Sequence, residues 1–138
     1  MQQQTIRVTD FDCRRLQSLI DGSKLVDMRD AGSVDWLERH LDEAEVTSAG
    51  HIGPDVVTMN SQVLVTDLDS GETFDFQVVF PRAADAAAGK ISVLAPLGMA
   101  VLGRKVGQQI TWQVPIGIRR LQVDDVLYQP EREGRDIA

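Results

Sequence analysis

The segment from residue 61 to residue 80 constrains the fold of this 138-residue chain more than any other part of it. Asp69-Ser70-Gly71-Glu72 is typical of a tight turn, because Gly71 adopts a positive φ without steric cost. After the turn, apolar side chains occupy positions 74, 76, 78 and 80, and polar ones occupy positions 73, 75 and 77. A period of two predicts a strand with one buried face, paired through the turn with the extended residues before it. We therefore expect an antiparallel hairpin at the centre of a sheet.

The remaining chain after residue 80 predicts more of the same sheet. Three further strands are expected, over residues 90–93, 110–114 and 121–128. In the last of them a β-bulge near Asp124-Asp125 would bring the apolar residues on both sides of it to one face. The polar residues 131–138 are expected to fray.

A very apolar segment, residues 91–103, lies between these strands. Leu97 to Leu102 predicts a short helix, with Pro96 at its start and Gly103 at its end. The segment serves either as core or as an exposed rim that contacts another protein. It could also do both, because a helix this short cannot bury every side.

The N-terminal third predicts two short antiparallel helices after a brief strand at residues 6–8. Thr9 is a helix N-cap with the Asp12 carboxylate three residues on, and the first helix is expected to end near Gly22. The second helix begins at Ser33 and carries a narrow apolar seam. The seam residues are Val34, Leu37, Leu41 and Ala44.

A break at Gly50-His51-Ile52-Gly53-Pro54 separates the two parts. The sequence therefore predicts an α+β fold: a short antiparallel helical hairpin over residues 1–50, and an antiparallel sheet domain with one short helix over residues 51–138.

Composition excludes several classes of function. The net charge of -7 argues against direct binding to nucleic acid and against an anionic membrane as partner. The single cysteine, Cys13, forms no internal disulfide and favours the cytosol. Residues 1–5 lack the features of a signal peptide, and the apolar segment 91–103 is too short to cross a bilayer. We expect a cytoplasmic protein.

Catalytic signatures are lacking, so we expect no enzyme activity, cofactor or metal site. The chain contains no glycine-rich phosphate loop, no HExxH and no paired CxxC. His40 and His51 are expected as surface or capping residues, and Cys13 as a packed thiol. Trp36 lies off the apolar seam, so it either packs on the sheet, the simpler interpretation, or anchors a partner.

Acidic side chains surround the predicted tip of the hairpin. These are Asp21, Asp27, Asp30 and Asp35. Two carboxylates at a protruding tip could hold Mg²⁺. The simpler interpretation is a solvated polar loop, in which Asp35 favours the positive N-terminus of the second helix.

Several motifs resemble the regulator of nucleoside diphosphate kinase (Rnk) family, which belongs to the Gre-type transcription elongation factors. The resemblance covers nearly the whole chain and is most specific over residues 56–131. The residues that carry it are Val57-Thr58-Met59-Asn60-Ser61, Val93-Leu94-Ala95-Pro96-Leu97-Gly98, Val101-Leu102-Gly103, Val106-Gly107, Trp112, Pro115 with Gly117, and Leu127-Tyr128-Gln129-Pro130-Glu131.

The resemblance implies a coiled-coil hairpin, an FKBP-like C-terminal domain, and binding at the secondary channel of bacterial RNA polymerase. Gre factors use acids at the tip of a long coiled coil to hold Mg²⁺ and stimulate transcript cleavage. Helices of about 11–13 residues reach only about 17–20 Å. A polymerase-binding regulator without cleavage activity is therefore the leading hypothesis.

The resemblance assigns polymerase contacts to the C-terminal domain. The assigned residues are Pro96, Leu97, Gly98, Leu102, Gly103, Pro115 and Gly117. The chain departs from the family pattern at Gln108, where an Asp is common, and at Ile116, which interrupts what is often Pro-Gly-Gly. An FKBP-like fold does not itself imply prolyl isomerase activity, and we expect none.

Two other functions stay open. The family name allows direct action on nucleoside diphosphate kinase, although it equally describes an indirect effect through transcription. The tip acids Asp27, Asp30 and Asp35 allow Gre-like cleavage stimulation.

Overall fold

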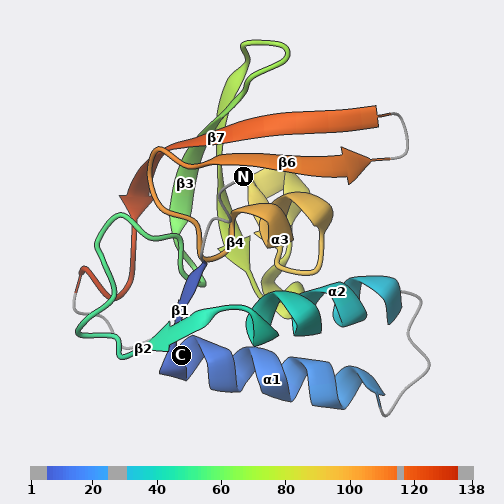
Figure 1. The fold of residues 1–138 in the computed structure, drawn as a ribbon, viewed down its shortest axis with the longest axis vertical. Helices are drawn as coiled ribbons and strands as arrows, with labels where there is room; N and C mark the ends of the chain where they lie inside the picture. Colours follow the sequence, from blue (N-terminus) through green and yellow to red (C-terminus); the bar gives the residue numbers. More distant parts are fainter. Residues whose placement is uncertain (1–5, 25–30, 115–116, 134–138) are drawn as a thin grey trace.

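The computed structural model describes residues 6–24, 31–114 and 117–133, and it has the expected mixture of helices and a curled β-sheet (Figure 1). A five-stranded sheet has the order β5-β4-β3-β7-β6, and a separate pair of strands has the order β1-β2. The elements are β1 (Arg7–Thr9), α1 (Asp10–Lys24), α2 (Ala31–Asp42), β2 (Glu45–Thr47), β3 (Gln62–Asp67), β4 (Thr73–Val79), the 3₁₀ turns η1 (Pro81–Ala83) and η2 (Ala86–Ala88), β5 (Lys90–Ser92), α3 (Pro96–Val101), β6 (Gln109–Val114) and β7 (Gly117–Tyr128).

The hairpin of β3 and β4 forms as its sequence predicts. The strands pair antiparallel, and Gly71 in the turn has a φ of 78°. The Asp67 carboxylate accepts the backbone N–H groups of Asp69 and Ser70, at 2.9 and 3.2 Å, which fixes the turn. Phe76 and Val78 are 3% and 0% exposed, so this part of the apolar face of β4 points into the core, whereas Phe74 near the start of the strand is 36% exposed.

Strand β7 contains the expected bulge. The register between β3 and β7 shifts between Leu64 and Val65, which leaves Asp124 as the extra residue. The Asp124 carboxylate accepts a hydrogen bond from the Thr66 hydroxyl. As a result Val123 and Val126, which have opposite parity along the chain, are both buried.

The sheet is mixed rather than purely antiparallel, and here the sequence-based expectation is wrong. Strand β5 pairs parallel with β4, from Lys90 opposite Gln77 to Ser92 opposite Val79. The turns η1 and η2 bring the chain back beside Gln77, so β5 runs along the last residues of β4 in the same direction. A second parallel pair, β1 with β2, was not expected at all.

Helix α1 starts where expected and ends later. The Thr9 hydroxyl accepts the Asp12 backbone N–H at 3.0 Å, which confirms Thr9 as the N-cap. The helix continues through Gly22 to Lys24, so Gly22 does not close it. A Cβ on Gly22 would meet nothing within 4 Å, which shows that this glycine is not required by crowding.

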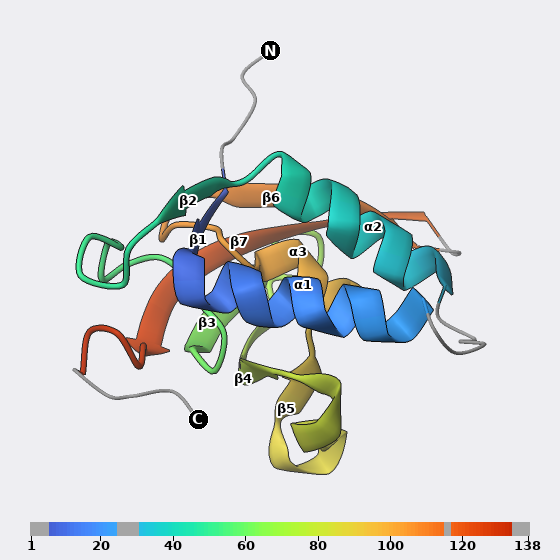
Figure 2. The same cartoon turned by 90° about the horizontal axis from the view of Figure 1, so that it is seen from below.

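Helices α1 and α2 lie side by side and antiparallel, with α3 and the sheet beyond them (Figure 2). The seam residues Val34 and Leu37 are 4% and 0% exposed and belong to one buried cluster with Leu16, Val63 and Met99. The helices are therefore packed on the sheet as well as on each other. The boundary between two domains at residue 50 stays a prediction.

Within the described ranges, no helix is both long and apolar enough to span a membrane.

Two glycines of the α3 segment are required by crowding. A Cβ on Gly98 would lie 2.2 Å from the Ser92 carbonyl oxygen. Gly103 has a φ of 82°, and a Cβ there would lie 2.8 Å from the Cβ of Ile6. The backbone of α3 is thus pressed directly against β5, and Gly103 against the chain just before β1.

We expect Gly98→Ala to lower the free energy of unfolding by about 1–3 kcal/mol or more, because backbone must move to admit the methyl group. Gly22→Ala is the matched control and should raise it by about 0.5–1 kcal/mol, since its site is open and helical. Urea unfolding of both variants measures the difference. Equal stabilities would contradict the close packing of α3.

Candidate functional site

The α3 residues that the family resemblance assigns to a polymerase contact differ in their exposure to solvent. Pro96 is exposed at the start of α3 and Leu97 is half-buried. Gly98, Leu102 and Gly103 are buried, and their assignment to a polymerase contact stays a prediction. A partner that reaches α3 meets Pro96 and Leu97.

The second part of the expected contact lies at the far end of β6 and β7. Pro115 lies outside the described residues, and Gly117 opens β7, paired with Val114. Beside it, Ile118 is 62% exposed. Sequence reasoning missed this side chain because its strand position alone does not say which face is covered.

The expected tip acids are only partly described. Asp27 and Asp30 lie outside the described residues. Asp35 is exposed on α2, beyond its first turn, so it does not stabilise the helix N-terminus as the simpler interpretation held. Asp21 accepts a hydrogen bond from Gln17 at 3.1 Å. In the parts of the chain that the structure describes, no three potential metal ligands come together.

The two histidines, Cys13 and Trp36 each contact other residues of this chain. His40 Nε2 lies 3.3 Å from the Leu102 carbonyl oxygen, and burial lowers the pKa of its imidazole. His51 is exposed beside Ser48, with 2.6 Å between Nδ1 and Oγ. Cys13 packs against the core, as expected. Trp36 stays 38% exposed beside the His40 ring, so it is not buried on the sheet.

A buried carboxylate joins α1 to the loop before β3. Asp12 is 1% exposed, its Oδ2 accepts the Met59 backbone N–H at 3.0 Å, and its Oδ1 accepts from Arg15 at 2.9 Å. Burial raises the pKa of this carboxyl, while the hydrogen bonds and the Arg15 charge oppose the rise. Sequence reasoning placed Asp12 only as a capping residue and missed this contact.

The C-terminal residues of the structure fasten the same loop. Gln129 is fully buried and its amide donates to the carbonyl oxygens of Gly53 and Val56, at 2.8 and 2.7 Å. Glu131 Oε1 accepts the Thr58 hydroxyl at 2.7 Å. Glu131 is therefore ordered and half-buried, and the expectation that the chain frays from residue 131 is wrong there.

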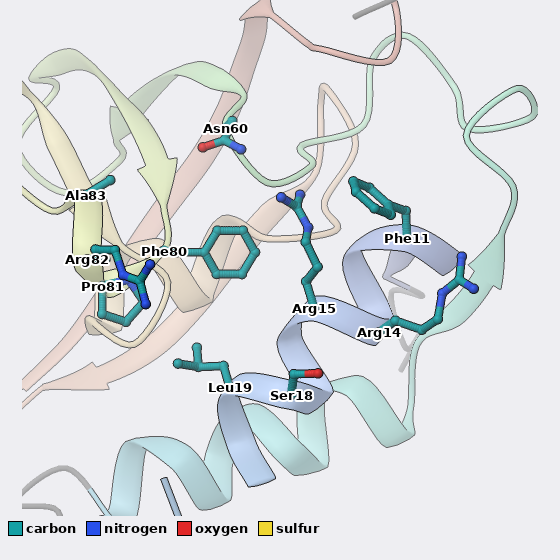
Figure 3. A pocket seen from close by; sticks show the side chains of 10 residues that line it. All are labelled: Phe11, Arg14, Arg15, Ser18, Leu19, Asn60, Phe80, Pro81, Arg82 and Ala83. Carbon is teal, nitrogen blue, oxygen red and sulfur yellow. The ribbon is translucent and has the colours of Figure 1, made fainter. Parts of the chain in front are cut away.

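An open groove lies between α1 and the η1 turn, with a volume of about 920 Å³. Figure 3 shows Arg15 rising from α1 into the space between Phe11 and Phe80. Its guanidinium carbon lies 4.4 Å from the centre of the Phe11 ring and 4.7 Å from that of Phe80. Arg14 and Arg82 lie on opposite sides of the groove (Figure 3). Periodicity could not reveal this groove, because its walls come from distant parts of the chain.

Comparison with known proteins identifies the class. Residues 52–128 match the family model described as "Transcription elongation factor, GreA/GreB, C-term". A solved structure of a GreA/GreB transcription elongation factor from Nitrosomonas europaea matches with a TM-score of 0.73 and 36% identity, over 90% of this chain and 100% of that one. The chain belongs to the GreA/GreB transcription elongation factor family.

Within that family the similarity is of two kinds. The regulator of nucleoside diphosphate kinase of Escherichia coli is 36% identical over 97% of both chains. The transcription elongation factor GreA of Thermotoga neapolitana is 40% identical, but over 65% of this chain and 57% of that protein. The chain is thus Rnk-like over its full length and GreA-like over part of it.

We expect Glu131→Gln to gain stability relative to the unaltered protein as pH rises. Burial, the largest cause, raises the pKa of Glu131 above its ordinary value of 4.5. The folded state then holds this proton more tightly than the unfolded state, so stability falls as pH rises from 4.5 through the raised pKa. Glutamine is neutral throughout and avoids that loss.

Denaturant unfolding across this pH range measures the difference between the two proteins. Glu133→Gln removes the same charge from an exposed side chain and is the control. A difference between Glu131→Gln and the unaltered protein that stays constant with pH would contradict a destabilising buried carboxylate.

Proposed function

We propose that this chain binds bacterial RNA polymerase as a Gre/Rnk-type transcription regulator, acting at the secondary channel without stimulating transcript cleavage. The main support is the share of each relative that aligns with this chain. The similarity to the Escherichia coli regulator of nucleoside diphosphate kinase spans 97% of both chains, whereas the similarity to Thermotoga neapolitana GreA spans 57% of GreA. On this proposal the protein is a cytoplasmic regulator and not an enzyme.

Helix length supports the absence of cleavage activity. Helices α1 and α2 have 15 and 12 residues, which corresponds to about 22 and 18 Å. A helical hairpin of that length is much shorter than the long coiled coil of a Gre factor, so it would reach much less far toward the catalytic centre of the polymerase. The coiled-coil packing of these helices and the FKBP-like description of the sheet belong to the same proposal.

The exposed start of α3 is the proposed polymerase contact, because Pro96 and Leu97 are the members of the assigned set in this segment that a partner can touch. We expect Pro96→Glu to weaken polymerase binding at least about tenfold by placing a charge in an apolar contact. Glutamate is acceptable at a helix N-terminus, so the fold should persist.

Pull-down with core polymerase, in competition with GreA, measures this effect. Ala87→Glu adds the same charge at an exposed position of η2 and should bind normally. Polymerase binding that an excess of GreA leaves unaltered would refute a shared site. Equal binding by both variants would refute the contact at α3.

We expect replacement of Asp27, Asp30 and Asp35 by alanine to leave both polymerase binding and elongation unaltered. The unaltered protein should add no transcript cleavage to stalled complexes. Cleavage that the unaltered protein stimulates and the triple variant does not would support the Gre-like alternative instead.

Direct action on nucleoside diphosphate kinase is the second candidate, because the full-length relative is named a regulator of that enzyme. Co-purification separates the two: a stable complex with the kinase, formed without polymerase, would favour direct action. An effect on the kinase that requires polymerase would favour action through transcription.

A further inference from the structure

We propose that the groove between α1 and η1 binds an acidic peptide segment of a partner protein, with an apolar side chain of that segment inserted into the groove. This site is distinct from the proposed polymerase contact at Pro96 and Leu97, because it has different lining residues and lies on different elements. It does not depend on the proposed function.

The groove has the lining that an apolar anchor needs. Its floor and walls include Leu19 from α1, and Phe80, Pro81 and Ala83 from the end of β4 and η1 (Figure 3). Phe11 is 37% exposed at its edge. A volume of about 920 Å³ exceeds what one aliphatic side chain fills, so the groove has room for the neighbouring residues of a peptide as well.

Charge selects an acidic occupant. Arg14, Arg15 and Arg82 all line the groove, although the chain as a whole has a net charge of -7. Arg15 pairs with Asp12, but among the described residues neither Arg14 nor Arg82 forms an ion pair. Both are exposed, so carboxylates on either side of an apolar anchor would meet a cation at each wall.

The groove is already organised before it binds anything. Arg15 is held between two aromatic rings and against a buried carboxylate. At the far wall, Asn60 has a φ of 67°, its N–H donates to the Val78 carbonyl at 2.7 Å, and its carbonyl accepts from Gln77 at 3.0 Å. These contacts fix the Asn60 backbone beside the groove, from where its side-chain carboxamide can hydrogen-bond to an extended peptide backbone. A rigid site loses less conformational entropy on binding.

A peptide fits better than single-stranded nucleic acid. Bases would stack on exposed aromatic faces. Here the Arg15 guanidinium already covers one face of Phe11 and one of Phe80. Beyond the groove the net charge is negative, which repels a long phosphate backbone but tolerates a short acidic segment.

The test uses the full chain and a short fluorescein-labelled peptide in which one leucine is flanked by glutamates. Fluorescence anisotropy should show binding, and the peptide with glutamines in place of glutamates should bind at least about tenfold more weakly. Amide NMR shifts on titration should centre on Phe11, Ser18, Phe80, Arg82 and Ala83. Arg14→Gln with Arg82→Gln should weaken binding roughly tenfold, because two exposed charge pairs are lost.

A control pair outside the groove and one further variant within it complete the test. Arg39→Gln with Lys105→Gln removes the same charge from exposed positions outside the groove and should bind normally. Ser18→Glu, at an exposed position of the groove, should weaken binding by repulsion. No binding of the acidic peptide, equal loss in the control pair, or tighter groove-dependent binding of a single-stranded RNA would each overturn the proposal.

Discussion

The Asp12 carboxylate is shared between the first turn of α1 and the loop that leads into β3, where it accepts the Met59 N–H and the Arg15 guanidinium. A buried carboxylate that loses its partners costs several kcal/mol, so α1 cannot slide or rotate on the sheet without a large penalty. The same contact fixes Arg15 between Phe11 and Phe80. The docking of the helices and the shape of the α1–η1 groove therefore have one common cause.

The features that sequence predicted well are local in origin. The β3–β4 hairpin, the bulge at Asp124 and the glycine after α3 are each specified by residues within a few positions of one another. The seam of α2 was predicted for the same reason, because Leu37 and its neighbours repeat along one face of a helix. The predicted polymerase contacts came from the family resemblance. In the structure Pro96 is exposed and Leu97 is half-buried, whereas Leu102 is buried.

The features that were missed depend on residues far apart in the chain. Parallel pairing of β4 with β5 and of β1 with β2 is set by where connecting segments return, which no local period records. Glu131 looked like part of a polar tail, yet Thr58, distant in sequence, holds it. The groove joins Arg15 of α1 to Phe80 after β4, so no single stretch of sequence contained it.

The pairing of β1 with β2 closes the helical hairpin at its base. Glu45 N–H donates to the Ile6 carbonyl at 2.9 Å, and Arg7 N–H donates to the Gly103 carbonyl at 3.0 Å, which ties the base to the segment just after α3. Residues added in equal number to the far ends of α1 and α2 would leave these contacts in place. Each residue added to both helices would lengthen the helical hairpin by about 1.5 Å. Under the proposed function, how far the protein reaches into its partner and how firmly it holds the partner's surface can change independently, one through insertions and the other through substitutions.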